Sequence, residues 1–147
     1  MRLKSWTHTG LAVRNLDEAI RFYCAAFNYE VMDHTRGMTE QVAAVTGIAG
    51  QSCDLAHLKS SVSDHVLELV QFHGHEGAAT PQPESPLRPG QAHVAFIVDD
   101  LDAALAKVQA LGARRLGSRF AVLPGYRSAY LTEPSGTFFE LEEISDE

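Results

Sequence analysis

The stretch HTGLAVRNLDEAI, residues 8–20, aligns without a gap with HVAFIVDDLDAAL, residues 93–105. The two copies start 85 residues apart, and each opens with a histidine. The two halves of the chain also end alike, with LEL at residues 67–69 and FEL at residues 139–141. A repeat of this kind indicates that both halves fold as the same structural unit.

Each half predicts the element order β-α-β-β-β. Apolar residues at helical spacing follow Asn15 in the first half and Asp99 or Asp100 in the second, and these residues are good helix N-caps. The predicted helices cover residues 16–27 and 101–111, and a short helix is expected over residues 39–46, stopped by Gly47. The predicted strands cover residues 5–13, 29–33, 53–59 and 64–72, and then residues 91–98, 114–119, 127–132 and 137–143.

The two halves are joined by residues 74–90, which contain four prolines and three glycines and predict a linker without regular structure. One half alone offers too little core for independent stability. We therefore expect residues 1–147 to form a single domain. Its first module covers about residues 5–73 and its second about residues 91–145.

Composition excludes several classes of function. The formal net charge is −7, which argues against a nucleic-acid partner. No apolar run reaches the length of a membrane span, and the first residues lack the apolar stretch of a signal peptide. The two cysteines, Cys24 and Cys53, have no metal-binding spacing. We expect a cytoplasmic protein with reduced thiols and no membrane partner.

The repeat places side chains that can bind a metal at equivalent points of the two halves. His8 and His93 open equivalent strands, and Glu68 and Glu140 lie in equivalent final strands. Imidazole and carboxylate are ligands of Zn²⁺, Ni²⁺, Co²⁺, Mn²⁺ and iron. One histidine or one glutamate alone is as readily a hydrogen-bonded or solvated residue. Because both types recur at matching places, the sequence favours a shared metal site.

These residues resemble the vicinal oxygen chelate superfamily, also called the glyoxalase, bleomycin resistance and extradiol dioxygenase family. The resemblance runs from Trp6 to Ile144. Its most specific parts are His8 with VRNLD at residues 13–17, His93 with FIVDDL at residues 96–101, and EPSGTFFEL at residues 133–141. It implies an α+β fold in which two βαβββ modules form a cupped, partly open mixed sheet around one divalent ion. It also implies a homodimer.

The order His, Glu, His, Glu is similar to that of glyoxalase I and methylmalonyl-CoA epimerase. The resemblance implies that His8, Glu68, His93 and Glu140 bind the metal, and that Glu140, or else Glu68, is the catalytic base. The expected activity is that of a lyase, isomerase or epimerase acting through an enediolate on a small substrate with neighbouring oxygens. One alternative is an iron-dependent ring-cleaving dioxygenase that uses three of these ligands. The other is a drug-binding resistance protein that works without metal.

Other candidates have simpler explanations. Gln71 replaces Glu68 as a ligand only if the strand register slips by one residue. His57 and His65 are expected near strand ends, as structural or solvated residues. The pair formed by His73 and His75 is expected to be solvated. Three further residues are candidates for lining the cavity, namely His34, Arg127 and Tyr130.

Overall fold

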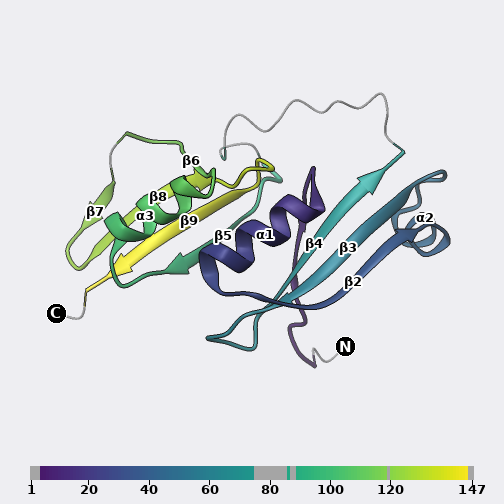
Figure 1. Ribbon diagram of the computed structural model, residues 1–147, viewed down its shortest axis with the longest axis horizontal. Helices are drawn as coiled ribbons and strands as arrows, with labels where there is room; N and C mark the ends of the chain where they lie inside the picture. The colour runs from purple at the N-terminus through teal and green to yellow at the C-terminus, as the bar shows by residue number, and fades with distance from the viewer. Residues whose placement is uncertain (1–3, 75–85, 87–88, 119, 146–147) are drawn as a thin grey trace. The chain divides into compact units, whose positions relative to one another are not determined.

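The computed structural model describes residues 4–74, 86, 89–118 and 120–145. The chain divides into two compact units, unit 1 at residues 1–79 and unit 2 at residues 80–147 (Figure 1). Most of the predicted linker lies outside the described residues. The assignment of residues 1–147 to a single domain therefore stays a prediction.

Unit 1 is a four-stranded mixed sheet with a long helix, α1, packed against one face. Its strands follow the order β1-β4-β3-β2; β1 is parallel to β4, and the other neighbours are antiparallel. The elements are β1 (Thr9–Ala12), α1 (Leu16–Phe27), β2 (Glu30–Met38), α2 (Glu40–Thr46), β3 (Ser52–Lys59) and β4 (Val66–His73). The predicted short helix is present as α2.

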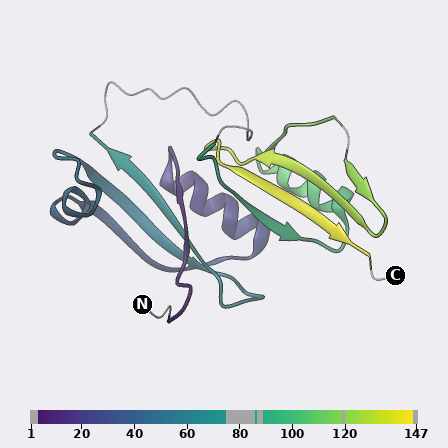
Figure 2. The same ribbon diagram turned by 180° about the vertical axis from the view of Figure 1, so that it is seen from behind.

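Unit 2 repeats this arrangement, with α3 packed against its own sheet (Figure 2). The strand order is β5-β9-β8-β6, β7 pairs with β8, and β5 is parallel to β9. The elements are β5 (His93–Ile97), α3 (Leu101–Ala110), β6 (Arg114–Arg115), β7 (Ala121–Leu123), β8 (Tyr126–Thr132) and β9 (Phe138–Ile144). The predicted α+β class with two repeated modules is confirmed.

The two long helices, α1 and α3, begin in the same way. The Asn15 side chain accepts a hydrogen bond from the Glu18 N–H at 3.0 Å, and Asp100 accepts one from Ala103 N–H at 2.9 Å. These caps satisfy amide groups that have no partner within the helix. Of the two aspartates proposed for the second cap, Asp100 is therefore the one that serves.

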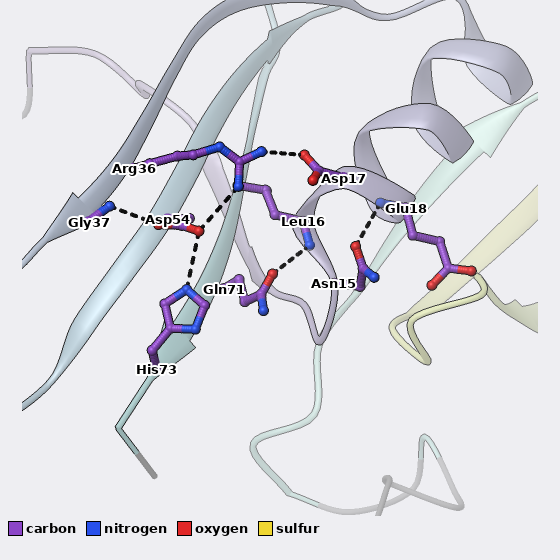
Figure 3. Close-up of polar contacts among 9 residues, drawn as sticks. All are labelled: Asn15, Leu16, Asp17, Glu18, Arg36, Gly37, Asp54, Gln71 and His73. Atoms are coloured by element: carbon purple, nitrogen blue, oxygen red, sulfur yellow. Dashed lines mark hydrogen bonds and ion pairs between the residues drawn. The ribbon is translucent and has the colours of Figure 1, made fainter. Parts of the chain in front are cut away.

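A side chain from the last strand of each unit supports the same helix end. Gln71 of β4 accepts a hydrogen bond from the Leu16 N–H at 2.8 Å (Figure 3). Glu143 of β9 accepts one from the Leu101 N–H at 2.7 Å. Gln71 thus faces α1, so the register does not slip and Gln71 is no substitute for Glu68.

Strand alternation separates the core from the opposite face of each sheet. Leu67 and Leu69 of β4 are fully buried on the side of α1, as are Phe139 and Leu141 of β9 on the side of α3. The residue between each pair, a glutamate, therefore points to the face that the helix leaves uncovered.

Two predicted strands differ from the structure. The strand predicted over residues 114–119 is only two residues long, and Arg119 lies outside the described residues. Instead β7 pairs with β8 across Pro124 and Gly125, a turn in which Gly125 has a φ of 67°. Strand β2 extends to Met38, beyond the predicted residue 33, because it pairs along β3 although its residues are almost all exposed.

The turn before β9 is built around a buried carboxylate. Glu133 is 1% exposed, and its side chain accepts hydrogen bonds from the Ser135 N–H at 2.7 Å and the Thr137 N–H at 2.9 Å. The turn predicted at residues 133–136 is present, and the structure shows why glutamate suits its first position. A buried charge is stable only when such donors surround it.

We predict that Glu133→Ala lowers the free energy of unfolding by about 2–3 kcal/mol, because a buried amide and a part-buried amide lose their shared acceptor. Glu133→Gln retains one acceptor oxygen and should cost less. Urea unfolding followed by far-UV circular dichroism measures both changes. Equal stability of Glu133→Ala and the unmodified protein would contradict this account of the turn.

Candidate metal centre

Unit 1 brings two of the predicted ligands together. His8 lies immediately before β1, and its Nε2 is 3.7 Å from Oε1 of Glu68 on β4. The two strands are parallel neighbours, with Gly10 opposite Glu68. His8 and Glu68 keep 40% and 21% of their side-chain area exposed, so both are accessible to an ion or a small molecule.

Gly10 leaves room for the Glu68 carboxylate. A Cβ atom added at Gly10 would lie 3.2 Å from Oε1 of Glu68, closer than an ordinary contact. A larger residue there would push the carboxylate aside by a few tenths of an ångström. The small residue predicted beside His8 therefore borders the carboxylate. In unit 2 the equivalent partner of Glu140 is Ala95.

Unit 2 brings the other predicted pair together. His93 Nε2, at the start of β5, is 3.5 Å from Oε2 of Glu140 on β9. Glu140 is 8% exposed, and its Oε1 accepts a hydrogen bond from the Tyr126 hydroxyl at 3.4 Å. The hydroxyl of Tyr130 lies 3.1 Å from His93 Nε2. Of the predicted cavity-lining residues, Tyr130 is therefore beside a predicted ligand.

Both tyrosine hydroxyls beside Glu140 stay protonated at neutral pH. Burial raises the pKa of Tyr130, and the negative charge of Glu140 raises it further. A hydrogen bond with Ser128 lowers the pKa of Tyr126, but burial and the charges of Glu142 and Glu140 outweigh it, and the net shift is upward. Both groups can therefore donate hydrogen bonds to a carboxylate or an imidazole.

His57 is part of the site, which sequence reasoning missed. It lies on β3 near the end of the strand, as expected, but directly opposite Glu68. Its Nε2 is 3.0 Å from Oε2 of Glu68, and its Nδ1 is 2.8 Å from Oδ1 of Asp33. Only the pairing register of β3 with β4 reveals this contact. The sequence shows no more than a histidine in a strand.

The remaining histidine and glutamine candidates lie elsewhere. His65 contacts Tyr29 and Thr9, in the structural role we expected. His73 is 3.2 Å from Asp54, on the side of the sheet where Gln71 meets α1 (Figure 3). It contacts a carboxylate there and is not merely solvated. His75 lies outside the described residues.

The two arginines near the helices do not reach the predicted ligands. Arg127 makes ion pairs with Asp102 at 2.8 Å and Glu143 at 3.4 Å, which ties β8 to the start of α3. Arg36 joins Asp17 in the same way in unit 1 (Figure 3). The prediction that Arg127 lines a cavity therefore gains no support, since its partners lie on the helix-bearing side.

The four predicted ligands thus form two pairs, one in each unit. Each pair joins a histidine and a glutamate at repeat-equivalent positions, at 3.7 Å and 3.5 Å. A site that unites His8, Glu68, His93 and Glu140 stays a prediction. No helix among the described residues is long and apolar enough to cross a membrane.

The charge of His57 follows from its neighbours. Burial alone would lower its pKa, but the hydrogen bond and negative charge of Asp33, together with the charge and hydrogen bond of Glu68, raise it above 6.5 overall. A raised folded-state pKa stabilises the fold below the unfolded-state value. That stabilisation is lost as the pH rises through the folded-state pKa.

We predict that Asp33→Asn lowers the pKa of His57 in the metal-free protein, because one of two neighbouring negative charges is removed. The variant should be less stable than the unmodified protein, and the loss in free energy of unfolding should be larger at pH 6, where His57 is more protonated, than at pH 8. Two-dimensional NMR of the imidazole resonances measures the pKa. Asp54→Asn, on the other face of β3, is the control, and an equal shift in both variants would refute the assignment.

Comparison with known proteins places these observations in a family. The model of the Glyoxalase/Bleomycin resistance protein/Dioxygenase superfamily matches residues 6–141. Uncharacterized protein YwbC of Bacillus subtilis (strain 168) is 27% identical over 138 residues, covering 90% of this chain and 92% of that protein. The family match over residues 6–141 therefore includes both predicted ligand pairs and parts of both units.

Solved structures show the same fold. A glyoxalase family protein from Bacillus cereus has a TM-score of 0.86 at 22% identity, covering 99% of this chain and 97% of that chain. The fosfomycin resistance protein FosX from Listeria monocytogenes, complexed with Mn(II) and sulfate, has a TM-score of 0.61 at 16% identity, covering 98% and 95%. At these identities the likeness concerns the fold alone.

Proposed function

Because the chain belongs to the Glyoxalase/Bleomycin resistance protein/Dioxygenase superfamily, we propose that it is a metal-dependent lyase, isomerase or epimerase of the glyoxalase type. Its substrate is a small molecule with oxygens on neighbouring atoms. The observation that carries the proposal is the repeated pair of an imidazole and a carboxylate, His8 with Glu68 and His93 with Glu140.

The residues fit a divalent ion. Two imidazoles and two carboxylates form a donor set that Zn²⁺, Ni²⁺, Co²⁺, Mn²⁺ and Fe²⁺ all accept. In the first pair, the absence of a side chain at Gly10 keeps the Glu68 carboxylate uncrowded. When bound, the ion would supply Lewis-acid polarisation of the substrate oxygens, which makes a neighbouring C–H more acidic.

Glu140 is the proposed base. Its Oε1 lies 3.4 Å from the Tyr126 hydroxyl, and its Oε2 lies 3.5 Å from His93 Nε2. A carboxylate that binds the ion only weakly would be free to take a proton from the substrate carbon. Return of the proton to the neighbouring carbon gives isomerisation. Return to the opposite face of the same carbon gives epimerisation. Glu68 is the second candidate, since His57 and His8 contact its two oxygens.

The relatives support the type of ligand. One FosX structure holds Mn(II) together with 1S,2S-dihydroxypropylphosphonic acid, a compound with hydroxyl groups on neighbouring carbons. A substrate with two neighbouring oxygens for this chain is consistent with that chemistry. As part of the same proposal, the chain acts as a homodimer.

We predict that the metal-loaded protein catalyses exchange of a carbon-bound proton of its substrate with solvent deuterium. Glu140→Gln should slow this exchange at least about 100-fold, because proton transfer by a positioned carboxylate contributes that much. NMR or mass spectrometry of 2-hydroxy ketones and 2-substituted thioesters in D₂O measures the exchange. Elemental analysis of the same samples gives the metal content.

Glu143→Gln is the matched control. It lies on the other face of β9 and caps α3, and unit 1 has a glutamine in the same role. The Glu143→Gln variant should keep the metal content and the rate of deuterium exchange of the unmodified protein. Exchange that persists unchanged in Glu140→Gln and in Glu68→Gln would refute the assignment of the base. Oxygen uptake with a catechol and Fe²⁺ would favour the dioxygenase, and drug binding by metal-free protein would favour the sequestering protein.

A further inference from the structure

Three side chains of unit 1 that can each bind a metal meet on one face of its sheet. They are His8 before β1, His57 on β3 and Glu68 on β4, the strand between β1 and β3. One ligand atom from each lies within 4.8 Å of the other two. The repeat and the resemblance read from the sequence point to His8 and Glu68, but neither points to His57.

One contact of His57 needs a positive charge, which either a proton or a metal ion can supply. Both ring nitrogens face carboxylate oxygens, Nδ1 at 2.8 Å from Asp33 and Nε2 at 3.0 Å from Glu68. A neutral imidazole has only one N–H. When Nδ1 donates to Asp33, the lone pair of Nε2 faces the lone pairs of Glu68. This contact is favourable only when a proton on Nε2 or a metal ion lies between the two atoms.

The spacing suits a metal ion. Two donors about 2.1 Å from a common ion lie about 3.0–3.4 Å apart at octahedral or tetrahedral angles. The distance from His57 Nε2 to Glu68 Oε2, 3.0 Å, falls in this range. His8 Nε2 lies 3.7 Å from the other oxygen, Oε1, and would have to move a few tenths of an ångström closer to share the ion. Asp33 completes the pattern, since histidine ligands usually donate their second N–H to a carboxylate.

Unit 2 has no equivalent third ligand among its described residues. The residue opposite Glu140 is Tyr130, where unit 1 has His57 opposite Glu68. A protonated phenol is a far weaker ligand for Zn²⁺ or Co²⁺ than an imidazole. The two halves of the repeat therefore differ in their capacity to bind metal alone.

We propose that unit 1 captures a divalent metal ion by itself through His8, His57 and Glu68, with Asp33 orienting the His57 ring. The inference rests on the proposed function for two of these ligands, and it adds His57 as a third. Binding then no longer requires His93 and Glu140, which serve to complete the coordination.

The experiment uses the full chain, freed of metal by chelation and titrated with Co²⁺. Isothermal titration calorimetry measures the dissociation constant, and the visible absorption of Co²⁺ reports its ligands. The His93→Ala/Glu140→Gln variant should still bind one Co²⁺. His57→Ala alone should weaken binding at least about 10-fold, and adding it to the double variant should abolish binding.

The control is His73→Ala. His73 has the same side-chain exposure as His8, 40%, and also contacts a carboxylate, but on the side of α1. This variant should bind Co²⁺ as the unmodified protein does. Asp33→Asn leaves all three ligands in place and should weaken binding about 10- to 100-fold, which tests the proposal even if His57→Ala folds poorly.

The outcomes separate this inference from the proposed function. If His57→Ala and Asp33→Asn keep the affinity and spectrum of the unmodified protein while the double variant loses Co²⁺, the inference is overturned and the four-ligand proposal stands. If the unmodified protein does not bind Co²⁺, both are overturned. If the double variant still binds Co²⁺ and loses it when His57 is also replaced, capture of the ion by unit 1 is supported, whatever the catalytic activity.

Discussion

The parallel pairing of the first and last strands in each unit is the constraint on which the site depends. It sets Gly10 opposite Glu68 in unit 1 and Ala95 opposite Glu140 in unit 2. In both cases the histidine two residues earlier comes beside the glutamate. Parallel neighbours need a crossover connection, and the intervening helix and strands provide it. The repeat thus builds the same imidazole–carboxylate contact twice.

The middle strands make the two halves chemically different. A histidine lies opposite the glutamate of unit 1, and a tyrosine lies opposite the glutamate of unit 2. Glu68 therefore has neighbours that can hold a cation, whereas Glu140 is more buried and has a hydroxyl donor. Under the proposed function, Glu68 would be the firmer metal ligand and Glu140 the base.

The sequence was sufficient for the helices and for the repeated histidine–glutamate pairs, whose role as metal ligands is a proposal. Asn15 and Gly47 are strong local signals, so the ends of α1 and α2 follow from the residues themselves. The length of β2 does not, because its exposed residues follow no apolar alternation and its extent depends on pairing with β3. His57 was missed for the same reason. Its contact with Glu68 depends on strand register, which is a tertiary property.

In each unit, the proposed metal ligand lies three residues before the side chain that accepts a hydrogen bond from the start of the helix. This spacing connects the scaffold to the site. Glu68 and Gln71 lie on opposite faces of β4, as Glu140 and Glu143 do on β9, because side chains alternate along a strand. On the face covered by the helix, Gln71 and Glu143 accept hydrogen bonds from the N–H groups of the first helical residues, Leu16 and Leu101. A slip of one residue would turn the capping side chain away from the helix and bury the ligand in the core. The hydrogen bond that starts each helix therefore also fixes which face the ligand occupies.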